Sequence, residues 1–435
     1  MTMLSHTLRE EQDAEPTGGF AFDVGVIGLG YVGLPTAIAY STAGSKVLGL
    51  DVNQARLRTI RSGGADLLVR DQDRLTRSLE STHLTLDDDP ERMSDCAAVI
   101  VCVPTPVDDY LTPDLHLLHA ACAAVVRQAV AGQTILLTST TYVGCTHDLL
   151  VAPLQARGFV VGRDLFVAFS AERIDPGNTD FEQEFVPRVV GGATPQCEEM
   201  AGRLLHRYAT NVHRVGSLGA AEMTKLLENT FRAVNIALAN EFADICGHLN
   251  IDVNDVIDAA ATKPYGFMPF RPGPGVGGHC IPCDPHYLLW QLKRQRVSAP
   301  LIEQSMVEIS QRPGRIVDQV RQSLSERGSA LAGARVLVIG IAYKPDVADL
   351  RESPALEILS RLEADGAAVG YLDHNFPTVT LQSGSVLTGI VRPDVFCADL
   401  ILIHTRHSGT DLSWISADQL LLDTRNPAVH RWAAA

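Results

Sequence analysis

The chain has 435 residues, which is longer than one ordinary domain and indicates two or three domains that each bury a core. Hydrophobic residues make up 46% and charged residues 20% of the sequence, which excludes a disordered chain and is typical of a folded globular protein. The formal net charge of -15 excludes sequence-independent nucleic-acid binding, because such binding needs clustered Lys and Arg side chains.

The sequence favours a cytoplasmic protein that does not span a membrane. No apolar run reaches the roughly 18 residues that a membrane-spanning helix requires. Residues 1–22 lack the apolar segment of a signal peptide, and we expect a flexible tail there. The nine cysteines lack the spacing of a disulfide framework, which favours free thiols in a reducing compartment.

The first part of the chain alternates between strand and helix patterns. An apolar run at residues 23–30 ends in glycines, residues 31–44 have helical spacing, and residues 46–53 form a second apolar run that ends near an aspartate. Together they predict a βαβ unit. Further strand-like runs follow at residues 97–104, 134–140 and 164–170. The pattern predicts a doubly wound α/β domain over residues 23–217.

The rest of the chain predicts a helical segment and a second α/β domain. Residues 218–312 have helical periodicity, interrupted by a stretch rich in proline and glycine. From residue 313 to 435 the alternation returns, with strand-like runs at residues 334–343, 367–373, 399–405 and 419–426. A helix is expected to begin at Ser353 and Pro354. The predicted fold class is therefore α/β, with two Rossmann-like doubly wound domains joined by a central helical region.

The motif GLGYVG places Gly28, Gly30 and Gly33 between the first strand and the first helix. Such glycines let the backbone turn tightly and approach a pyrophosphate at a helix N-terminus. Asp51 follows at the end of the second strand, where an acid can bind a ribose diol. The pattern predicts a dinucleotide site and favours NAD over NADP, although a glycine turn that serves only packing remains the alternative.

The stretch PGPGVGGHCIPCDP combines glycines with Cys280 and Asp284. Gly273, Gly275 and Gly277 permit close approach of a ligand, which would bring Cys280 to its edge. A thiolate beside a hydride acceptor can add to an aldehyde and form a thioester that water opens. The alternative is an ordinary buried thiol.

Cys280 and Cys283 also form a CxxC pair, which is typical of redox or zinc sites. A zinc site needs two further ligands, and the chain has no second CxxC or HxxxH to supply them. We therefore predict no metal.

Two other stretches carry candidate catalytic residues. Lys225 and Asn229 are four residues apart in a helical pattern, so they share one face and could point at one oxyanion. A solvated helix face could carry them equally well. Glu172 follows a predicted strand, where the loops of an α/β sheet gather at a ligand crevice. Its alternative role is that of a capping carboxylate.

Six sequence blocks occur in one order along the chain: GLGYVGLP, VCVPTP, the STxxxGxT pattern from Ser139 to Thr146, AEMTKLLENT, PGPGVGGHCIPCDP and GIAYKPDVADLRESPA. Through these blocks the chain resembles the nucleotide-sugar 6-dehydrogenases, the UDP-glucose and GDP-mannose dehydrogenase family, from Val24 to about Asn426. The resemblance implies an NAD-binding N-terminal domain, a central region that forms a homodimer, and a C-terminal domain that binds the UDP end of a UDP-sugar. The implied reaction is two successive oxidations of the sugar C6 alcohol to a carboxylate.

The resemblance also assigns residue roles. Cys280 matches the nucleophile, Lys225 and Asn229 the oxyanion-stabilising pair, Glu172 the acid/base that handles the hydrolytic water, and Asp284 the carboxylate beside the cysteine. Residues matched to the cofactor are Gly28, Gly30, Tyr31, Val32, Gly33, Asp51, Thr105 and Thr140, and Thr140 is also matched to the water. Residues matched to the substrate are Glu172, Arg173, Lys225, Asn229, Arg271, Gly273, Gly275, Gly277, His279, Lys344 and Arg351.

The pattern GGHCIPxDPxYL resembles the branch that acts on UDP-N-acetylhexosamines. Our first hypothesis is therefore a UDP-N-acetylglucosamine or UDP-N-acetylmannosamine 6-dehydrogenase of polysaccharide biosynthesis. The same reaction on UDP-glucose is the alternative. A two-electron hydroxy-acid dehydrogenase, which would not need Cys280, and a binding protein without turnover are less favoured.

Overall fold

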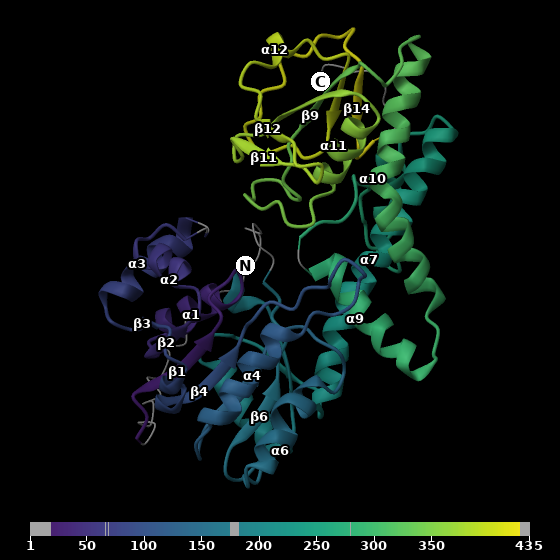
Figure 1. Ribbon diagram of the computed structural model, residues 1–435. Coiled ribbons are helices and arrows are strands. Elements are labelled where there is room, and N and C mark those ends of the chain that lie inside the picture. Colours follow the sequence, from purple (N-terminus) through teal and green to yellow (C-terminus); the bar gives the residue numbers. More distant parts are fainter. Residues whose placement is uncertain (1–18, 66, 68, 175–181, 279, 427–435) are drawn as a thin grey trace, which may run out of the picture.

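The computed structural model describes residues 19–65, 67, 69–174, 182–278 and 280–426 (Figure 1). Its N-terminal part contains an eight-stranded sheet with the order β3-β2-β1-β4-β5-β6-β7-β8. Neighbouring strands are parallel except for β6 and β7. The strands are β1 (Phe22–Ile27), β2 (Val47–Leu50), β3 (Leu84–Asp87), β4 (Cys96–Val101), β5 (Thr134–Leu137), β6 (Phe166–Phe169), β7 (Arg188–Gly192) and β8 (Val212–Arg214).

Helices cover both faces of this sheet, which explains why its central strands β1 and β4 are largely apolar. Val24 and Val26 of β1 belong to one core and Ile27 to the core on the opposite face. The helices are α1 (Gly33–Thr42), α2 (Gln54–Arg61), α3 (Val69–Glu80), α4 (His116–Gln128), α5 (Ala152–Ala156) and α6 (Pro195–His206). The order reverses between β1 and β4, so the carboxyl ends of these strands form a switch point where ligands bind in such folds.

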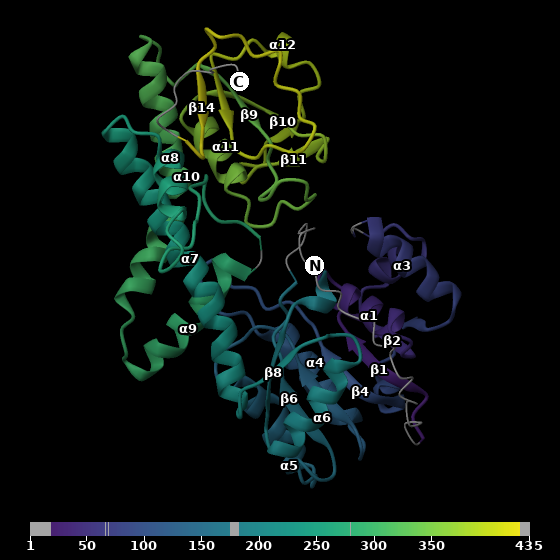
Figure 2. The same cartoon turned by 180° about the vertical axis from the view of Figure 1, so that it is seen from behind.

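The central part consists of helices. They are α7 (Leu218–His248), α8 (Val253–Ala261), α9 (Cys280–Gln295) and α10 (Pro300–Glu326), and α7 packs against both α9 and α10. Figure 2 shows α7 and α10 side by side along one edge of the molecule, where they connect the two α/β parts. Helix α10 continues through Pro313 and Gly314, so the helical region runs past residue 312 and directly into the C-terminal part.

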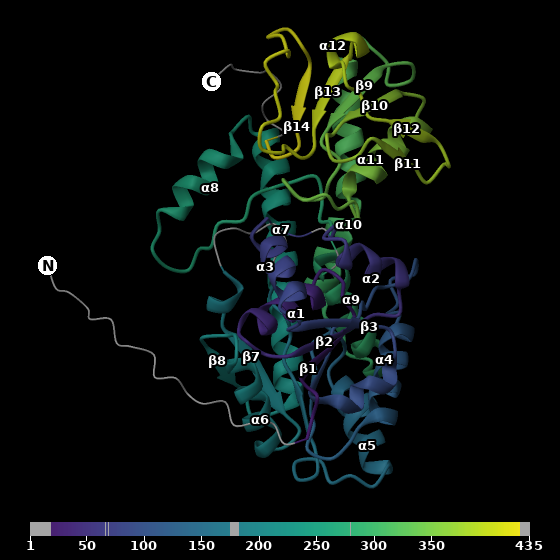
Figure 3. The ribbon, with the colours of Figure 1, turned by 90° about the vertical axis from the view of Figure 1, so that its left-hand side faces the viewer.

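The C-terminal part is a smaller parallel sheet with the order β10-β9-β13-β14 (Figure 3). Its strands are β9 (Arg335–Ile339), β10 (Ala368–Leu372), β13 (Leu400–Ile403) and β14 (Leu421–Asp423), and β11 (Thr378–Thr380) pairs with β12 (Val386–Thr388) as a hairpin. Helix α11 (Pro354–Ala364) packs against α10, and a short α12 (Pro393–Phe396) follows the hairpin.

These observations confirm the predicted fold class: two Rossmann-like α/β parts are joined by helices. Helix α11 begins at Pro354 with Ser353 as its N-cap residue, as expected. The strands β3, β7, β8, β11 and β12 escaped prediction because each has at most five residues and several are partly polar. The exact domain limits stay a prediction. Within the described residues, no helix is long and apolar enough to cross a bilayer.

Candidate active site

The turn between β1 and α1 holds the GxGxxG motif. Gly28 has a φ of +85°, and a Cβ there would lie 2.6 Å from the carbonyl oxygen of Cys102 at the end of β4. A Cβ on Gly33 would overlap the carbonyl oxygen of Gly28. Gly30, in contrast, has open space around its Cβ position, beside the first turn of α1, which has no side-chain cap. The turn therefore fits a pyrophosphate at a helix N-terminus.

Asp51 is fixed beside this turn. One carboxylate oxygen accepts a hydrogen bond from the backbone N–H of Leu29 at 2.8 Å, and the other accepts one from that of Asn53 at 2.8 Å. Each oxygen keeps lone-pair capacity for a ribose hydroxyl. The turn with Gly28 and Gly33, and Asp51 beside it, thus have the geometry that fits the adenosine half of NAD, while the binding roles of these residues stay predictions.

Four predicted catalytic residues meet where α7 packs against α9 and the end of β6. Asn229 of α7 donates from Nδ2 to Oδ2 of Asp284 in α9. Lys225, one helical turn earlier, donates from Nζ to the backbone oxygen of Glu172 at 3.0 Å. Lys225, Asn229 and Asp284 are all buried. A lysine charge and an amide thus lie side by side in a shielded site, as the stabilisation of an oxyanion requires.

The carboxyl group of Asp284 is a weaker acid than an ordinary aspartate. Burial raises the pKa of its carboxyl to about 6, although the Lys225 charge and the Asn229 hydrogen bond pull in the opposite direction. A carboxyl group with this pKa can hold or release a proton near neutral pH.

Cys280 is the first residue of α9 and is exposed. It lies one turn before Asp284, and the helix N-terminus favours negative charge on its sulfur. Cys283 is buried, and burial raises the pKa of its thiol to about 12, so this thiol stays protonated. In the described part of the chain, no group of three or more His, Cys, Asp or Glu side chains could hold a metal ion.

Glu172 is held by an arginine that the sequence analysis missed. Arg188 of β7, almost fully buried, forms an ion pair with Oε1 of Glu172, and the backbone N–H of Arg173 donates to the same oxygen at 2.8 Å. The Arg173 side chain turns to Glu228 of α7 instead. The carboxylate is therefore fixed and charge-compensated. Its proposed role toward water stays a prediction.

The glycine-rich loop before Cys280 packs against the C-terminal part. A Cβ on Gly275 would lie 2.8 Å from the ring of Pro354, and one on Gly277 would overlap Tyr343. Gly278 has a φ of +81° and donates its N–H to the backbone oxygen of Arg351 at 3.0 Å. These glycines thus allow close contact between two parts of the protein, which their sequence alone did not reveal.

Arg351 connects this contact to the cofactor turn. Its guanidinium lies over the ring of Tyr31, 4.3 Å from the ring centre, and Asp349 holds it through Nε at 3.0 Å and Nη2 at 2.7 Å. Arg351 therefore bridges the GxGxxG turn and the C-terminal part. Lys344 lies in the same loop. The substrate roles predicted for both residues stay predictions.

The structure does not bring every predicted residue to the α7–α9 junction. Arg271 turns to α8, where it pairs with Asp258 and donates to Asn254 at 3.1 Å. Thr105 is buried after β4, and Thr140 lies in the loop after β5. His279 lies outside the described residues.

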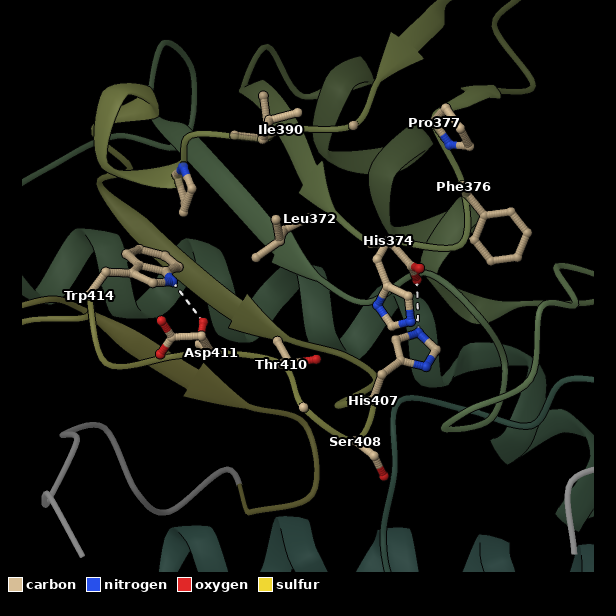
Figure 4. A pocket seen from close by; sticks show the side chains of 15 residues that line it. Leu372, His374, Phe376, Pro377, Ile390, His407, Ser408, Thr410, Asp411 and Trp414 are labelled. Carbon is tan, nitrogen blue, oxygen red and sulfur yellow. Dashed lines mark hydrogen bonds and ion pairs between the residues drawn. The ribbon is translucent and has the colours of Figure 1, made fainter.

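The C-terminal sheet carries a separate pocket of about 760 Å³ at the carboxyl ends of β10 and β13. Trp414 lies on one side of it and Phe376 on the other, with His374 and His407 between them (Figure 4). His407 donates from Nε2 to Oδ2 of the buried Asp373 at 3.0 Å. The carboxylate at the end of β10 is thus covered by a protein side chain.

Comparison with protein families matches three consecutive regions of the chain. All three descriptions refer to the UDP-glucose/GDP-mannose dehydrogenase family: its NAD binding domain matches residues 22–209, its central domain residues 219–309, and its UDP binding domain residues 337–429.

Similar proteins match most of the chain. The UDP-N-acetyl-D-glucosamine 6-dehydrogenase of Pseudomonas aeruginosa is 33% identical over 387 residues, which is 88% of this chain and 90% of that protein. The UDP-N-acetyl-D-mannosamine dehydrogenase of Yersinia pestis is 34% identical over 79% of this chain and 82% of that protein. Among solved structures, the UDP-D-ManNAc dehydrogenase of Pyrococcus horikoshii has a TM-score of 0.84 at 29% identity, covering 93% of this chain and 95% of that one.

Proposed function

Because the chain belongs to the UDP-glucose/GDP-mannose dehydrogenase family, we propose that it oxidises the C6 alcohol of a UDP-N-acetylhexosamine to the uronic acid. NAD is the cofactor of this family's N-terminal domain and, when bound, accepts the hydride of each oxidation. The names of the relatives from Pseudomonas and Yersinia support an N-acetylated sugar over glucose. We further propose that the product serves polysaccharide biosynthesis in the cytoplasm. The spacing of the nine cysteines, which is not that of a disulfide framework, supports that location.

One observation carries the proposal: Cys280 begins α9, one turn before an aspartate that is bonded to Asn229 beside Lys225. A two-electron dehydrogenase needs no nucleophile next to its oxyanion-binding groups. An enzyme that must hold an aldehyde between two oxidations does need one.

The residues suggest the following sequence of events. After the first oxidation, the Cys280 sulfur bonds to C6 of the aldehyde, and the carbonyl oxygen becomes an oxyanion that the Lys225 ammonium and the Asn229 amide stabilise. Loss of a second hydride from C6 leaves a thioester on Cys280. Water then attacks this carbon, its proton passes to a nearby base, and the C–S bond breaks to release the carboxylate and the thiolate. Asp284, with its pKa of about 6, is suited to exchange protons at this site.

The test is the amount of NADH formed per sugar consumed, measured with UDP-N-acetylglucosamine, UDP-N-acetylmannosamine, UDP-N-acetylgalactosamine and UDP-glucose. Two equivalents with an N-acetylated sugar support the proposal. One equivalent indicates a simple dehydrogenase, and none with any sugar indicates a binding protein. The Cys280→Ala variant should form no carboxylate. Cys397→Ala, which alters the other exposed cysteine, should keep full activity.

We also propose that the protein acts as a homodimer through α7. One side of this helix exposes large apolar side chains at helical spacing, each between 40% and 64% exposed: Met223, Leu227, Phe231, Leu238, Phe242, Ile245 and Leu249. An apolar stripe of this length is costly in water, and a second copy of the chain supplies a matching stripe by symmetry.

Sedimentation at micromolar concentration tests the dimer. The double variant Leu238→Glu, Phe242→Glu should sediment as a monomer, because it would bury two carboxylates in the interface. Val160→Glu places one carboxylate on an exposed apolar residue of the N-terminal part, and this variant should remain dimeric. A monomeric wild-type protein would refute the proposal.

A further inference from the structure

The loop after β5, residues 138–146, contains Thr140, which the family resemblance matches to the cofactor and to the hydrolytic water. Its near end is attached to the sheet: Thr138 donates from Oγ1 to the backbone oxygen of Val101 at 2.8 Å, and Ser139 donates to that of Val103 at 2.8 Å. Its far end is in addition bonded to α7 and α9, the two helices that carry the proposed catalytic side chains.

The attachment to α7 is made by Glu222. Its Oε2 accepts the N–H of Gly144 at 2.6 Å, and its Oε1 accepts the N–H and the hydroxyl of Thr146 at 2.9 and 2.7 Å. Glu222 is only 1% exposed. It precedes Lys225 by three residues, so the two side chains lie on neighbouring positions of one helix face.

The attachment to α9 is made by Gln291. The N–H of Val143 donates to Oε1 of Gln291 at 3.1 Å, and Nε2 of Gln291 donates to the backbone oxygen of Val143 at 2.7 Å. The neighbouring Trp290 packs its ring on Tyr142, with 5.7 Å between ring centres. Gln291 follows Cys280 by about three helical turns of α9, so it lies on the same side of the helix as the thiol.

These contacts differ from ordinary loop packing in two respects. Every polar atom of the Glu222 carboxylate and of the Gln291 amide is matched by a loop atom of the opposite hydrogen-bonding character. In addition, the partners are far apart in sequence, so the bonds fix tertiary geometry and not local turn structure. Burying the Glu222 carboxylate raises its pKa, and the three donors of the loop favour its charged form.

We propose that Glu222 and Gln291 are positioning residues, which fix the 138–146 loop, and therefore Thr140, relative to Lys225 and Asn229 on α7 and Cys280 and Asp284 on α9. The inference rests on the proposed function for the roles of these groups. The bracing itself is independent of those roles. Hydride transfer and attack on C6 both require reacting atoms in near-contact geometry, and a displacement of about 1 Å can cost about 100-fold in rate.

Glu222→Gln tests the attachment to α7. The amide keeps one acceptor oxygen but turns an N–H₂ group toward a loop N–H, so at least one bond is lost. We expect kcat to fall by about 10- to 100-fold while KM for NAD and for the UDP-sugar changes less than about threefold. The kinetic isotope effect with a sugar deuterated at C6 should rise, because hydride transfer becomes slower. Glu199→Gln, on the exposed surface of α6, is the matched control and should change none of these.

Gln291→Met tests the attachment to α9 with a side chain of similar size and no hydrogen-bonding group. It should show the same split between kcat and KM, and it keeps the test valid if the first variant folds poorly. Gln322→Met, on the exposed side of α10, is its control.

Hydrogen exchange separates this proposal from the proposed function. The amide protons of Val143, Gly144 and Thr146 should exchange faster in the two variants, whatever reaction the enzyme catalyses. Faster exchange with unchanged kcat and isotope effect would overturn the positioning role. Reduced kcat with fully protected amides would also overturn it, because the effect would then not act through the loop. If instead Cys280→Ala were fully active, the proposed thioester route would fail while the exchange result stood.

Discussion

The two Rossmann-like parts of this protein have the same turn after their first strand, but the turn has a different role in each part. In the N-terminal part, Gly28 follows β1, and the next N–H, of Leu29, donates to Asp51 at the end of β2 at 2.8 Å. In the C-terminal part, Gly340 follows β9, and the N–H of Ile341 donates to Asp373 at the end of β10, also at 2.8 Å. Both glycines have positive φ.

The difference lies in what surrounds each aspartate. Asp51 is partly exposed beside a short turn, residues 28–32, that leads directly into α1. Asp373 is buried under His407, and residues 340–353 form a long loop before α11. That loop carries Tyr343 and Arg351 to the glycines before Cys280 and to the cofactor turn.

The comparison teaches that the strand, glycine and aspartate are a structural unit, and that the loop decides its use. A short turn leaves a phosphate cradle open. In the C-terminal half, His407 from the segment after β13 covers the aspartate, and the long loop after β9 extends to another part of the protein. The same covalent pattern thus supports cofactor binding in one half and domain contact in the other.

The largest effect is expected from a substitution in the glycine turn of the N-terminal part. Gly33→Ala would place a Cβ on the carbonyl oxygen of Gly28, so the turn cannot keep its geometry. We expect loss of NAD binding by titration calorimetry and a decrease in activity of more than about 100-fold. Gly30→Ala sharpens the result, because Gly30 has open space in the protein alone. If this variant keeps its melting temperature and weakens NAD binding, the space serves the ligand. Undiminished NAD binding in both variants would contradict the assignment.

A glycine substitution in the equivalent turn of the C-terminal half should reduce stability instead of cofactor affinity. Gly340 has a φ of +72°, and its Cβ would overlap the carbonyl oxygen of Thr405. Gly340→Ala should destabilise this half by about 2–4 kcal/mol, measured by urea unfolding. Gly384→Ala, where φ is +87° and space is open, should cost only about 1 kcal/mol. If both variants lost the same free energy of unfolding, the close approach of Gly340 to Thr405 would not contribute to stability.

The carboxyls of Asp284 and Asp373 should shift stability with pH in opposite directions. Burial raises the pKa of Asp284 to about 6, so its contribution to stability is complete below pH 4 and is lost as the pH rises to about 6. Asp284→Asn should therefore stabilise the fold at pH 8 by up to about 3 kcal/mol, and by less at pH 5, while activity is lost. Urea unfolding at the two pH values measures this. A larger gain at pH 5 than at pH 8 would contradict it.

The contribution of Asp373 to stability changes with pH in the opposite direction. Burial alone would raise its pKa, but hydrogen bonds from His407 and from the N–H groups of Ile341 and Asn375 hold the pKa below the usual value. Its contribution to stability is therefore present above pH 4 and is lost as the pH falls through the lowered pKa. Asp373→Asn should destabilise the protein at pH 7 by about 1–3 kcal/mol and flatten the acid side of the stability profile. An unchanged profile would exclude this carboxylate as a source of acid sensitivity.

The smallest effect concerns the contact between the halves. Arg351→Lys keeps the charge but loses the planar contact with Tyr31 and the paired bonds to Asp349. We expect KM for NAD to rise about two- to fivefold with little change in melting temperature. Arg361→Lys on the exposed side of α11 should leave KM unchanged. If Arg351→Lys raised KM for NAD equally in a protein that also carries Tyr31→Leu, the contact between Arg351 and Tyr31 would not couple the two halves.

Features that a short motif encodes were predictable from the sequence. The βαβ unit, Gly28, Gly33 and Asp51 follow from spacing, and the α7 pair of Lys225 and Asn229 follows from helical periodicity. What escaped prediction depends on contacts between distant segments. Nothing near Arg188 indicates that it will meet Glu172, and Glu222 looks like any acid on a helix until the loop that it holds is placed. The glycines before Cys280 were predicted to admit a ligand, yet several of them also admit Tyr343 and Pro354.

That last contact has a mechanical consequence. Since Gly277 lies directly against Tyr343, and Gly278 is bonded to the Arg351 backbone, a rotation of the C-terminal half that kept these contacts would move the segment that leads to Cys280. If such a rotation opens the site for release of the uronic acid product, it would also move the Cys280 sulfur away from the site. The C-terminal half and the Cys280 sulfur would then move together. A sugar that is still bonded to the sulfur could therefore not leave through this opening unless its bond to the sulfur broke.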